Sequence, residues 1–144
     1  MPALIALLWQ VATLRRPPQA LPASATLTGL TLLAHAASGA LLAAQFLPVA
    51  RALAYAVAET AFMAGAAQAL LALAGHRVRA GQTVSALAGT GTVINVAALP
   101  VMWGVNPAVP PPLWTTLAVL MLFGWSFAVA SHVLRHALSV PPAA

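Results

Sequence analysis

The chain has 144 residues, of which 62% are hydrophobic and 5% are charged, and its formal net charge is +5. This balance excludes a soluble domain, because too few polar residues remain to cover a water-facing surface. It also argues against nucleic-acid binding, because the arginines flank apolar segments instead of gathering on one solvated face. We therefore expect an all-α polytopic membrane protein that lies in the lipid bilayer and, having no cysteine, forms no disulfide.

The first element is a short apolar segment over residues 1–14, which Arg15, Arg16 and two prolines end. It is too short to cross a bilayer, and its charges follow the apolar run, whereas a cleaved signal peptide carries them before it. We expect an interfacial helix here. The alternative is a helix that docks on a partner protein, because the polar face is thin for a helix lying on lipid. The candidate docking residues are Leu7, Leu8, Trp9 and Leu14.

Four long apolar segments follow, at about residues 25–46, 48–75, 82–103 and 113–138. At ~1.5 Å rise per residue, each is long enough to cross the ~30 Å hydrocarbon core of a bilayer. Ser24 is a candidate N-cap for the first span, and Gly75 is a candidate C-cap for the second. The sequence predicts a single membrane domain, residues 1–144, built as a four-helix transmembrane bundle with a short N-terminal interfacial helix.

The arginines predict the orientation of the four spans. All but Arg51 fall on one side of the four-span arrangement. An excess of Arg in short loops marks the cytoplasmic side. We therefore expect the N- and C-termini in the cytoplasm. The arginines on that side are Arg15, Arg16, Arg77, Arg79 and Arg135.

Small residues spaced four apart predict where the helices approach one another. In lipid such pairs let helix backbones come close, and together they favour a compact bundle over one that encloses a wide pore. These pairs are Ala61, Gly65 and Ala69 in the second span, Ser85 and Gly89 in the third, and Gly124 and Ala128 in the fourth.

Every span places a polar group near the middle of the membrane. Glu59, the only acidic residue of the chain, lies inside the second span. A carboxylate there costs roughly 2.5–3.5 kcal/mol on insertion scales unless it is paired, is protonated or faces a wet cavity. His35 is at similar depth and is the expected partner of Glu59, with Asn95 as the other candidate. The predicted intramembrane polar layer comprises His35, Glu59, Thr60, Asn95 and Ser126.

Two interpretations of this layer stay open. In the functional one, Glu59 and His35 handle a proton or a ligand, because ionisable groups inside a membrane are costly and rarely idle. In the structural one, the polar side chains hydrogen-bond between helices and only stabilise the bundle. For the Ser, Thr and Asn members we expect the structural role.

Other motifs do not predict a site. His132 and His136 are four apart, but no glutamate lies between them and no third ligand is near in the sequence. Haem b between His35 and His132 is disfavoured, because the two histidines lie at different depths. The run Gly89–Gly91 begins like a dinucleotide fingerprint, but no strand precedes it and its third glycine is replaced. We expect no catalytic residue, no cofactor-binding residue and no metal ligand, and hence no enzyme.

Two stretches, Arg16-Pro-Pro-Gln-Ala-Leu-Pro-Ala-Ser24 and Ser131-His-Val-Leu-Arg-His-Ala-Leu-Ser139, are distinctive. They resemble segments of a group of small, uncharacterised four-span inner-membrane proteins of proteobacteria. That group is expected to have an acidic residue after the position of Gln19, where this chain has Ala20. The resemblance implies a bacterial inner membrane and four spans; it implies no activity and no functional residue.

The function that the sequence favours is a non-catalytic accessory, assembly or scaffold subunit of a larger inner-membrane complex, bound to other integral membrane subunits or to itself. This expectation rests on the small size, the absence of a catalytic constellation and the apolar surface of residues 1–14. The alternative is a small proton-coupled transporter that works through Glu59 and His35. A haem or quinone membrane anchor is the least favoured.

Overall fold

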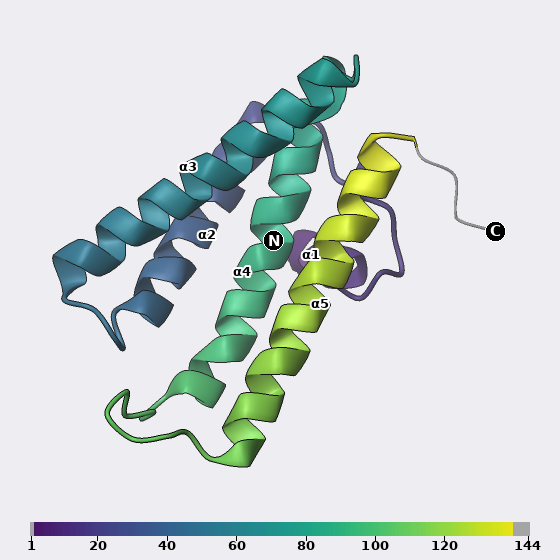
Figure 1. Ribbon diagram of the computed structural model, residues 1–144. Helices are drawn as coiled ribbons and strands as arrows, with labels where there is room; N and C mark the ends of the chain where they lie inside the picture. Colours follow the sequence, from purple (N-terminus) through teal and green to yellow (C-terminus); the bar gives the residue numbers. More distant parts are fainter. Residues whose placement is uncertain (1, 140–144) are drawn as a thin grey trace.

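A computed structural model describes residues 2–139, and this part of the chain is all-helical (Figure 1). Each of its four long helices is long and apolar enough to cross a membrane, as the sequence predicted. The helices are α1 (Pro2–Ala12), α2 (Ala25–Ala43), α3 (Val49–Leu73), α4 (Ala80–Met102) and α5 (Leu113–Ala137). Two 3-10 turns, η1 (Pro18–Ala20) and η2 (Arg77–Arg79), precede α2 and α4.

The ends of the long helices have the caps that the sequence predicted. The Ser24 hydroxyl accepts a hydrogen bond from the backbone N–H of Leu27 at 3.4 Å and so caps the start of α2. After α3, Gly75 has a φ of +77°, a conformation that glycine adopts without a Cβ clash. The next N–H, that of His76, donates to the carbonyl of Leu71 at 2.7 Å and closes the helix end.

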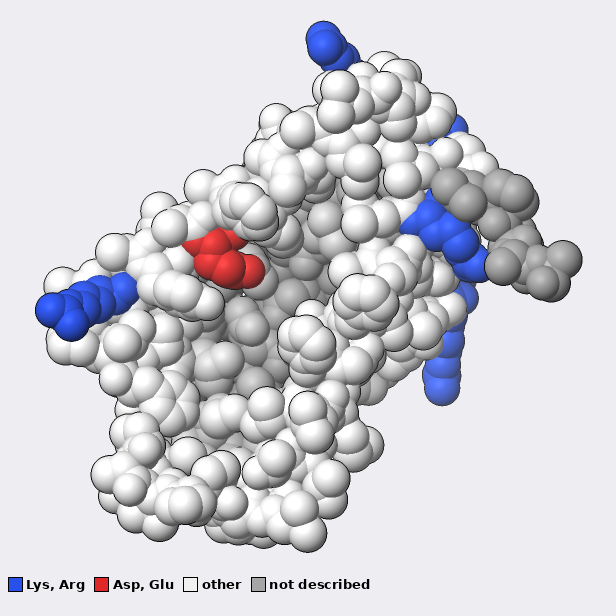
Figure 2. Space-filling model, viewed as in Figure 1, with Lys and Arg blue, Asp and Glu red and all other residues white. Residues whose placement is uncertain are grey.

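The bundle is organised around α4. This helix packs against α1, α2, α3 and α5, whereas α5 packs mainly on α4 and on η1. Figure 1 shows α4 between α3 and α5. In the most apolar part of each helix, 44% of the α4 residues are buried inside the chain, against 11% for α5. The side between α3 and α5 therefore stays open, and Figure 2 shows a hollow there.

One of the three predicted small-residue contacts is confirmed. Ser85 is fully buried, and a Cβ added at Gly89 would lie 2.5 Å from a terminal carbon of Leu8, so α1 approaches α4 closely at this glycine. The prediction for α5 was wrong, because a Cβ at Gly124 meets nothing within 4 Å. A glycine in a membrane helix marks a close approach only where a neighbouring helix lies over it.

The prediction for α3 was also wrong. The stripe Ala61, Gly65 and Ala69 is exposed. The helix packs instead through another small-residue stripe, turned around the helix from the first. That buried stripe comprises Ala52, Ala56, Thr60 and Ala64. In so alanine-rich a helix more than one face carries small residues four apart, and the positions of α2 and α4 decide which face is used.

Helix α1 packs into the chain's own core. Leu7 and Leu8 lie against a buried cluster formed by α1, the segment before α2, α4 and α5. Because Gly89 lies nine residues into α4, Leu8 reaches α4 about 13 Å from its start. Of the predicted docking residues, Trp9 and Leu14 stay exposed, at 52% and 43%. The interfacial position of α1 in a membrane remains a prediction.

The two distinctive stretches, residues 16–24 and 131–139, meet at one end of the molecule. The Gln19 side-chain amide donates to the carbonyl of His136 at 2.8 Å. In return, Nε2 of His132 donates to the carbonyl of Arg16 at 3.1 Å. These bonds join the segment before α2 to the last turns of α5. The two stretches therefore form one structural unit, although 106 residues separate Ser24 from Ser131 in the sequence.

Candidate functional site

His35 of α2 and Glu59 of α3 form a hydrogen-bonded pair. The Nε2 atom of the imidazole lies 3.2 Å from Oε2 and 3.4 Å from Oε1 of the carboxylate. The His35 side chain is 7% exposed and the Glu59 side chain is 44% exposed. The imidazole is therefore the buried half of the pair, and the carboxylate is the accessible half. In Figure 2 the single red patch, which is Glu59, lies beside the hollow.

Gly91 of α4 makes room for the imidazole. A Cβ at this position would lie 2.6 Å from Cε1 and 2.7 Å from Nδ1 of His35. The ring fits between α2 and α4 only because position 91 has no side chain. The sequence analysis missed this role, although a signal was present. Glycine inside a helix lowers helix stability by about 1 kcal/mol relative to alanine. Two glycines as close together as Gly89 and Gly91 therefore indicate that a neighbouring group packs against the helix there.

A small cavity of about 150 Å³ lies beside the pair. His35, Glu59 and Gly91 line it from one side, and Ser126 of α5 lines it from the other. The Nδ1 atom of His35 is buried, and no residue of 2–139 gives it a hydrogen bond. Buried polar atoms without a protein partner are ordinarily met by water, and each water occupies ~30 Å³. The cavity has the size and the polar wall to hold such water.

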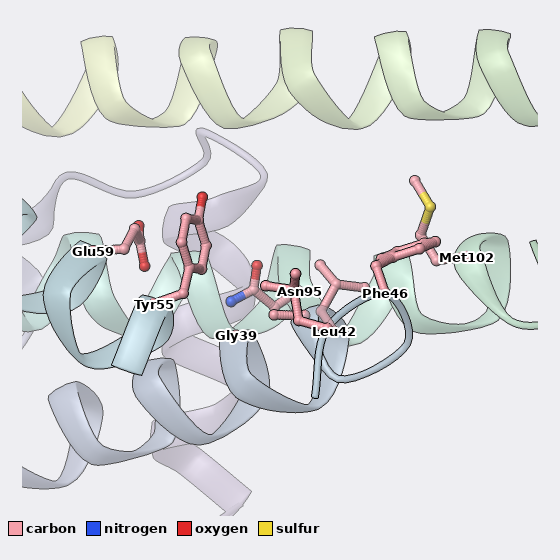
Figure 3. Close-up of a pocket in the computed structure, with 9 residues that line it drawn as sticks. Gly39, Leu42, Phe46, Tyr55, Glu59, Asn95 and Met102 are labelled. Carbon is pink, nitrogen blue, oxygen red and sulfur yellow. The ribbon is translucent and has the colours of Figure 1, made fainter. Parts of the chain in front are cut away.

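A larger cavity of about 420 Å³ lies on the other side of Glu59. It is formed by the second half of α2, the first half of α3 and the second half of α4. Figure 3 shows Glu59 and Tyr55 on α3, Leu42 on α2, Phe46 in the turn after α2, and Asn95 on α4. Glu59 lines both cavities. The lining residues are Gly39, Leu42, Ala43, Phe46, Leu47, Tyr55, Glu59, Asn95 and Met102.

The other members of the predicted polar layer have separate roles. Asn95 donates its amide N–H to the hydroxyl of Ser38 at 3.2 Å, and Ser38 donates to the carbonyl of His35 at 3.0 Å. Asn95 thereby ties α4 to α2 next to the pair. Ser126 is on the wall of the small cavity. Thr60 is 7% exposed, and its hydroxyl has no partner within the described part of the chain.

The two histidines near the end of α5 lie 4.3 Å apart, measured between ring centroids. Nδ1 of His136 donates to the carbonyl of His132 at 2.8 Å. Nε2 of His132 donates to the carbonyl of Arg16, and Nε2 of His35 donates to the carboxylate of Glu59. Over residues 2–139, no three His, Cys, Asp or Glu side chains come together as a metal-binding group.

The site is therefore one carboxylate, backed by a buried imidazole and open to two cavities. A carboxylate in this setting can take up a proton, or it can hold one positive charge of a ligand. Comparisons of the chain with protein-family models, with curated proteins and with solved structures find no match in any of the three.

Proposed function

We propose that the chain is a small proton-coupled carrier in the bacterial inner membrane, with Glu59 as the group that binds the proton. One observation carries the proposal: Glu59 is paired with buried His35 and lines two cavities. A half-exposed carboxylate inside a membrane span is costly unless a proton, a cation or water compensates its charge. A carboxylate that binds a proton and a substrate alternately couples the movement of the proton to that of the substrate.

The shape of the larger cavity supports access from one side of the membrane. Its lining runs from Glu59 past Tyr55 to Phe46 and Leu47, beside the turn that joins α2 to α3, and to Met102 at the end of α4. These ends lie away from the arginine-rich end of the molecule. By the positive-inside rule we place the arginine-rich end and both termini in the cytoplasm. The larger cavity then faces the opposite side.

The titratable and charged groups around Glu59 also favour proton exchange. The groups that can titrate near the Glu59 carboxylate are His35 from α2 and Tyr55 from α3, and α4 contributes only the amide of Asn95. No arginine lies within ion-pair distance of Glu59 in the described structure. The carboxylate is therefore not held permanently by a fixed cation, and a proton can be its counter-charge.

The carrier proposal can be tested in liposomes that contain the purified protein, an acidic interior and the trapped pH-sensitive dye pyranine. Solutes are added outside from a panel of monovalent amines, quaternary ammonium ions, amino acids, sugars and weak acids. We expect at least one class to raise the interior pH faster than in empty liposomes. The Glu59→Gln variant should lose this effect, and Arg51→Gln, an exposed charge change on the same helix, should keep it.

Two results would contradict the carrier. The first is a pH gradient that no solute of the panel discharges faster than in empty liposomes. The second is an unchanged discharge by Glu59→Gln, provided that this variant elutes as a single species with the helical content of the wild type.

The second candidate is the accessory-subunit function. The exposed stripe Ala61, Gly65 and Ala69 favours it, because small residues four apart let another membrane helix approach closely. A Cβ at Gly65 meets nothing within 4 Å of its own chain. Leu7 and Leu8 pack against the chain's own core, so these two residues do not offer a free surface to a partner.

Co-purification from native membranes in a mild detergent tests this second candidate. We expect Gly65→Leu to release a partner subunit and Gly29→Leu to retain it. Gly29 is a matched control, because it is also exposed on a long helix with nothing within 4 Å of its Cβ position. Recovery of the chain without any stoichiometric partner at native expression would exclude an accessory role.

A further inference from the structure

The larger cavity has a negative charge and no positive one. The ring proton of His35 is donated to Glu59, so with a neutral imidazole the pair carries one net negative charge. Arg51 precedes Glu59 by eight residues, which places it about 12 Å away along α3. Figure 2 shows white atoms between the blue side chains and the red patch of Glu59. With a neutral imidazole, the charge of this site is balanced either by a proton or by the positive charge of a ligand.

The rest of the cavity wall is apolar and aromatic. Tyr55 lies one turn before Glu59 on α3, and Phe46 lines the cavity from the turn that joins α2 to α3 (Figure 3). The faces of aromatic rings attract ammonium groups. Leu42 and Met102 complete an apolar wall, and the flexible methionine thioether adapts to ligands of different shape. A ligand that fits this wall carries its charge on an apolar body.

The donor set argues against calcium and zinc as the preferred ligand. Calcium requires six to eight oxygen ligands, and structural zinc four nitrogen or sulfur ligands. The cavity offers one carboxylate, the hydroxyl of Tyr55 and the amide of Asn95. A cation that brings its own apolar surface loses little hydration on entry and needs only one opposite charge.

The depth of the carboxylate argues against a lipid headgroup. Glu59 lies ten residues after Val49, the first residue of α3, and thus about 15 Å inside the helix. That distance is half of the ~30 Å hydrocarbon core, whereas headgroups lie outside the core. The volume of about 420 Å³ falls within the ~300–1,000 Å³ that is usual for small-molecule sites. A free small molecule fits both the depth and the size.

From these four observations we infer that the larger cavity binds a lipophilic amine, a single ammonium group on a compact apolar body. Its ammonium pairs with the Glu59 carboxylate and its apolar body lies against Tyr55 and Phe46. The inference that this amine is transported rests on the carrier proposal and names the class of substrate. The inference that the amine binds in the cavity is independent of the carrier proposal.

Equilibrium dialysis of the purified full chain in detergent tests the inference. The probe is radiolabelled benzyltrimethylammonium, a permanent cation with one aromatic ring. Its neutral competitor is neopentylbenzene, in which carbon replaces the charged nitrogen. We expect saturable binding at one site per chain, displaced by the unlabelled cation and not by the neutral isostere. Glu59→Gln should weaken the affinity by about tenfold or more, because it removes the charge that the probe needs.

A second pair of variants tests the location without touching the carboxylate. Ala43→Leu fills the cavity and should weaken binding by about tenfold. Ala58→Leu adds the same side chain to an exposed position of α3 that does not line the cavity, and it should leave the affinity unchanged. The comparison of Ala43→Leu with Ala58→Leu shows whether the probe binds in this cavity even if Glu59→Gln does not fold. Folding of each variant is checked by circular dichroism and gel filtration.

Three outcomes would overturn the inference: no saturable binding up to millimolar probe, equal displacement by the neutral isostere, or the wild-type affinity in a folded Glu59→Gln or Ala43→Leu variant. These outcomes are separable from a failure of the carrier proposal. Discharge of the pH gradient by a solute other than an amine, with no probe binding, keeps the carrier and rejects the amine. Probe binding without any discharge keeps the amine site and rejects the carrier.

Discussion

Helices α4 and α5 have different positions although both are apolar enough to cross a membrane. The most apolar part of α5 has the highest mean hydropathy of the four long helices, 1.9, yet only 11% of its residues are buried in the chain. The corresponding part of α4 has a mean hydropathy of 1.6 and is 44% buried. Lipid is as apolar as leucine, so hydropathy does not draw a membrane helix into the centre of a bundle. Properties of α4 other than its hydropathy must therefore explain its central position.

Hydroxyl groups and glycines distinguish the central helix. Ser85 donates to the carbonyl of Gly81 at 2.9 Å, and its hydroxyl lies 2.8 Å from that of Thr28 on α2. Thr90 donates to the carbonyl of Ala86 at 2.7 Å. The hydroxyl groups of these side chains have hydrogen-bond partners close to the helix, and their small size lets neighbouring helices approach closely. α4 is thus central because its surface is small and internally bonded.

The largest expected effect contrasts a glycine of α4 with one of α5. Gly91→Ala places a Cβ within 2.7 Å of His35 and must displace its buried ring, whereas the Cβ of Gly124→Ala meets nothing. Both variants gain the same helix propensity. Their difference should therefore isolate the clash, about 1–3 kcal/mol against Gly91→Ala. Thermal unfolding in detergent measures it, and equal melting temperatures for the two variants would refute the close approach.

A smaller effect is expected for the bond that fixes α1 to α5. Nε1 of Trp125 donates to the carbonyl of Ala12 at 2.7 Å, and its ring meets Trp9 edge to face at 6.3 Å between centroids. Trp125→Phe should cost about 1 kcal/mol through the lost hydrogen bond. Trp114→Phe, at a 61% exposed position of the same helix, should cost less. If the two variants unfold at the same temperature, the bond does not hold α1 in place.

The smallest effect is expected on the outer face of α5. Phe127 is 70% exposed, and its surroundings in a bilayer are lipid. Phe127→Leu exchanges one apolar side chain for another and should change the unfolding free energy by less than about 0.5 kcal/mol. The variant could instead lose as much stability in native membranes as Trp125→Phe does, but lose none as the purified protein. That result would reveal a partner on this face.

The four long apolar helices and their caps were predictable from the sequence because they depend on local properties. Length, hydropathy and a serine or glycine at a helix end act within a few residues of each other, as Ser24 and Gly75 show. The packing of α1 was not predictable in this way. Its contact with Gly89 depends on where α4 lies, and a short apolar helix has the same sequence whether lipid or protein covers it.

The candidate site was predictable in part. Matching depths in two spans were enough to suggest that His35 meets Glu59, because an intramembrane carboxylate needs a partner. The role of Gly91 and the cavity beside Tyr55 were missed. Both arise from the side-to-side arrangement of α2, α3 and α4, and hydropathy and residue depth do not specify how helices are rotated about their axes.

The single carboxylate of Glu59, which lines both cavities, would also fix the energetics of exchange by the proposed carrier. One negative group would hold either one proton or one monovalent ammonium, so each would replace the other one for one. Such an antiport moves no net charge across the membrane. A membrane voltage, worth ~2.3 kcal/mol per charge at 100 mV, would then contribute nothing to the accumulation ratio, and the pH difference alone would set it.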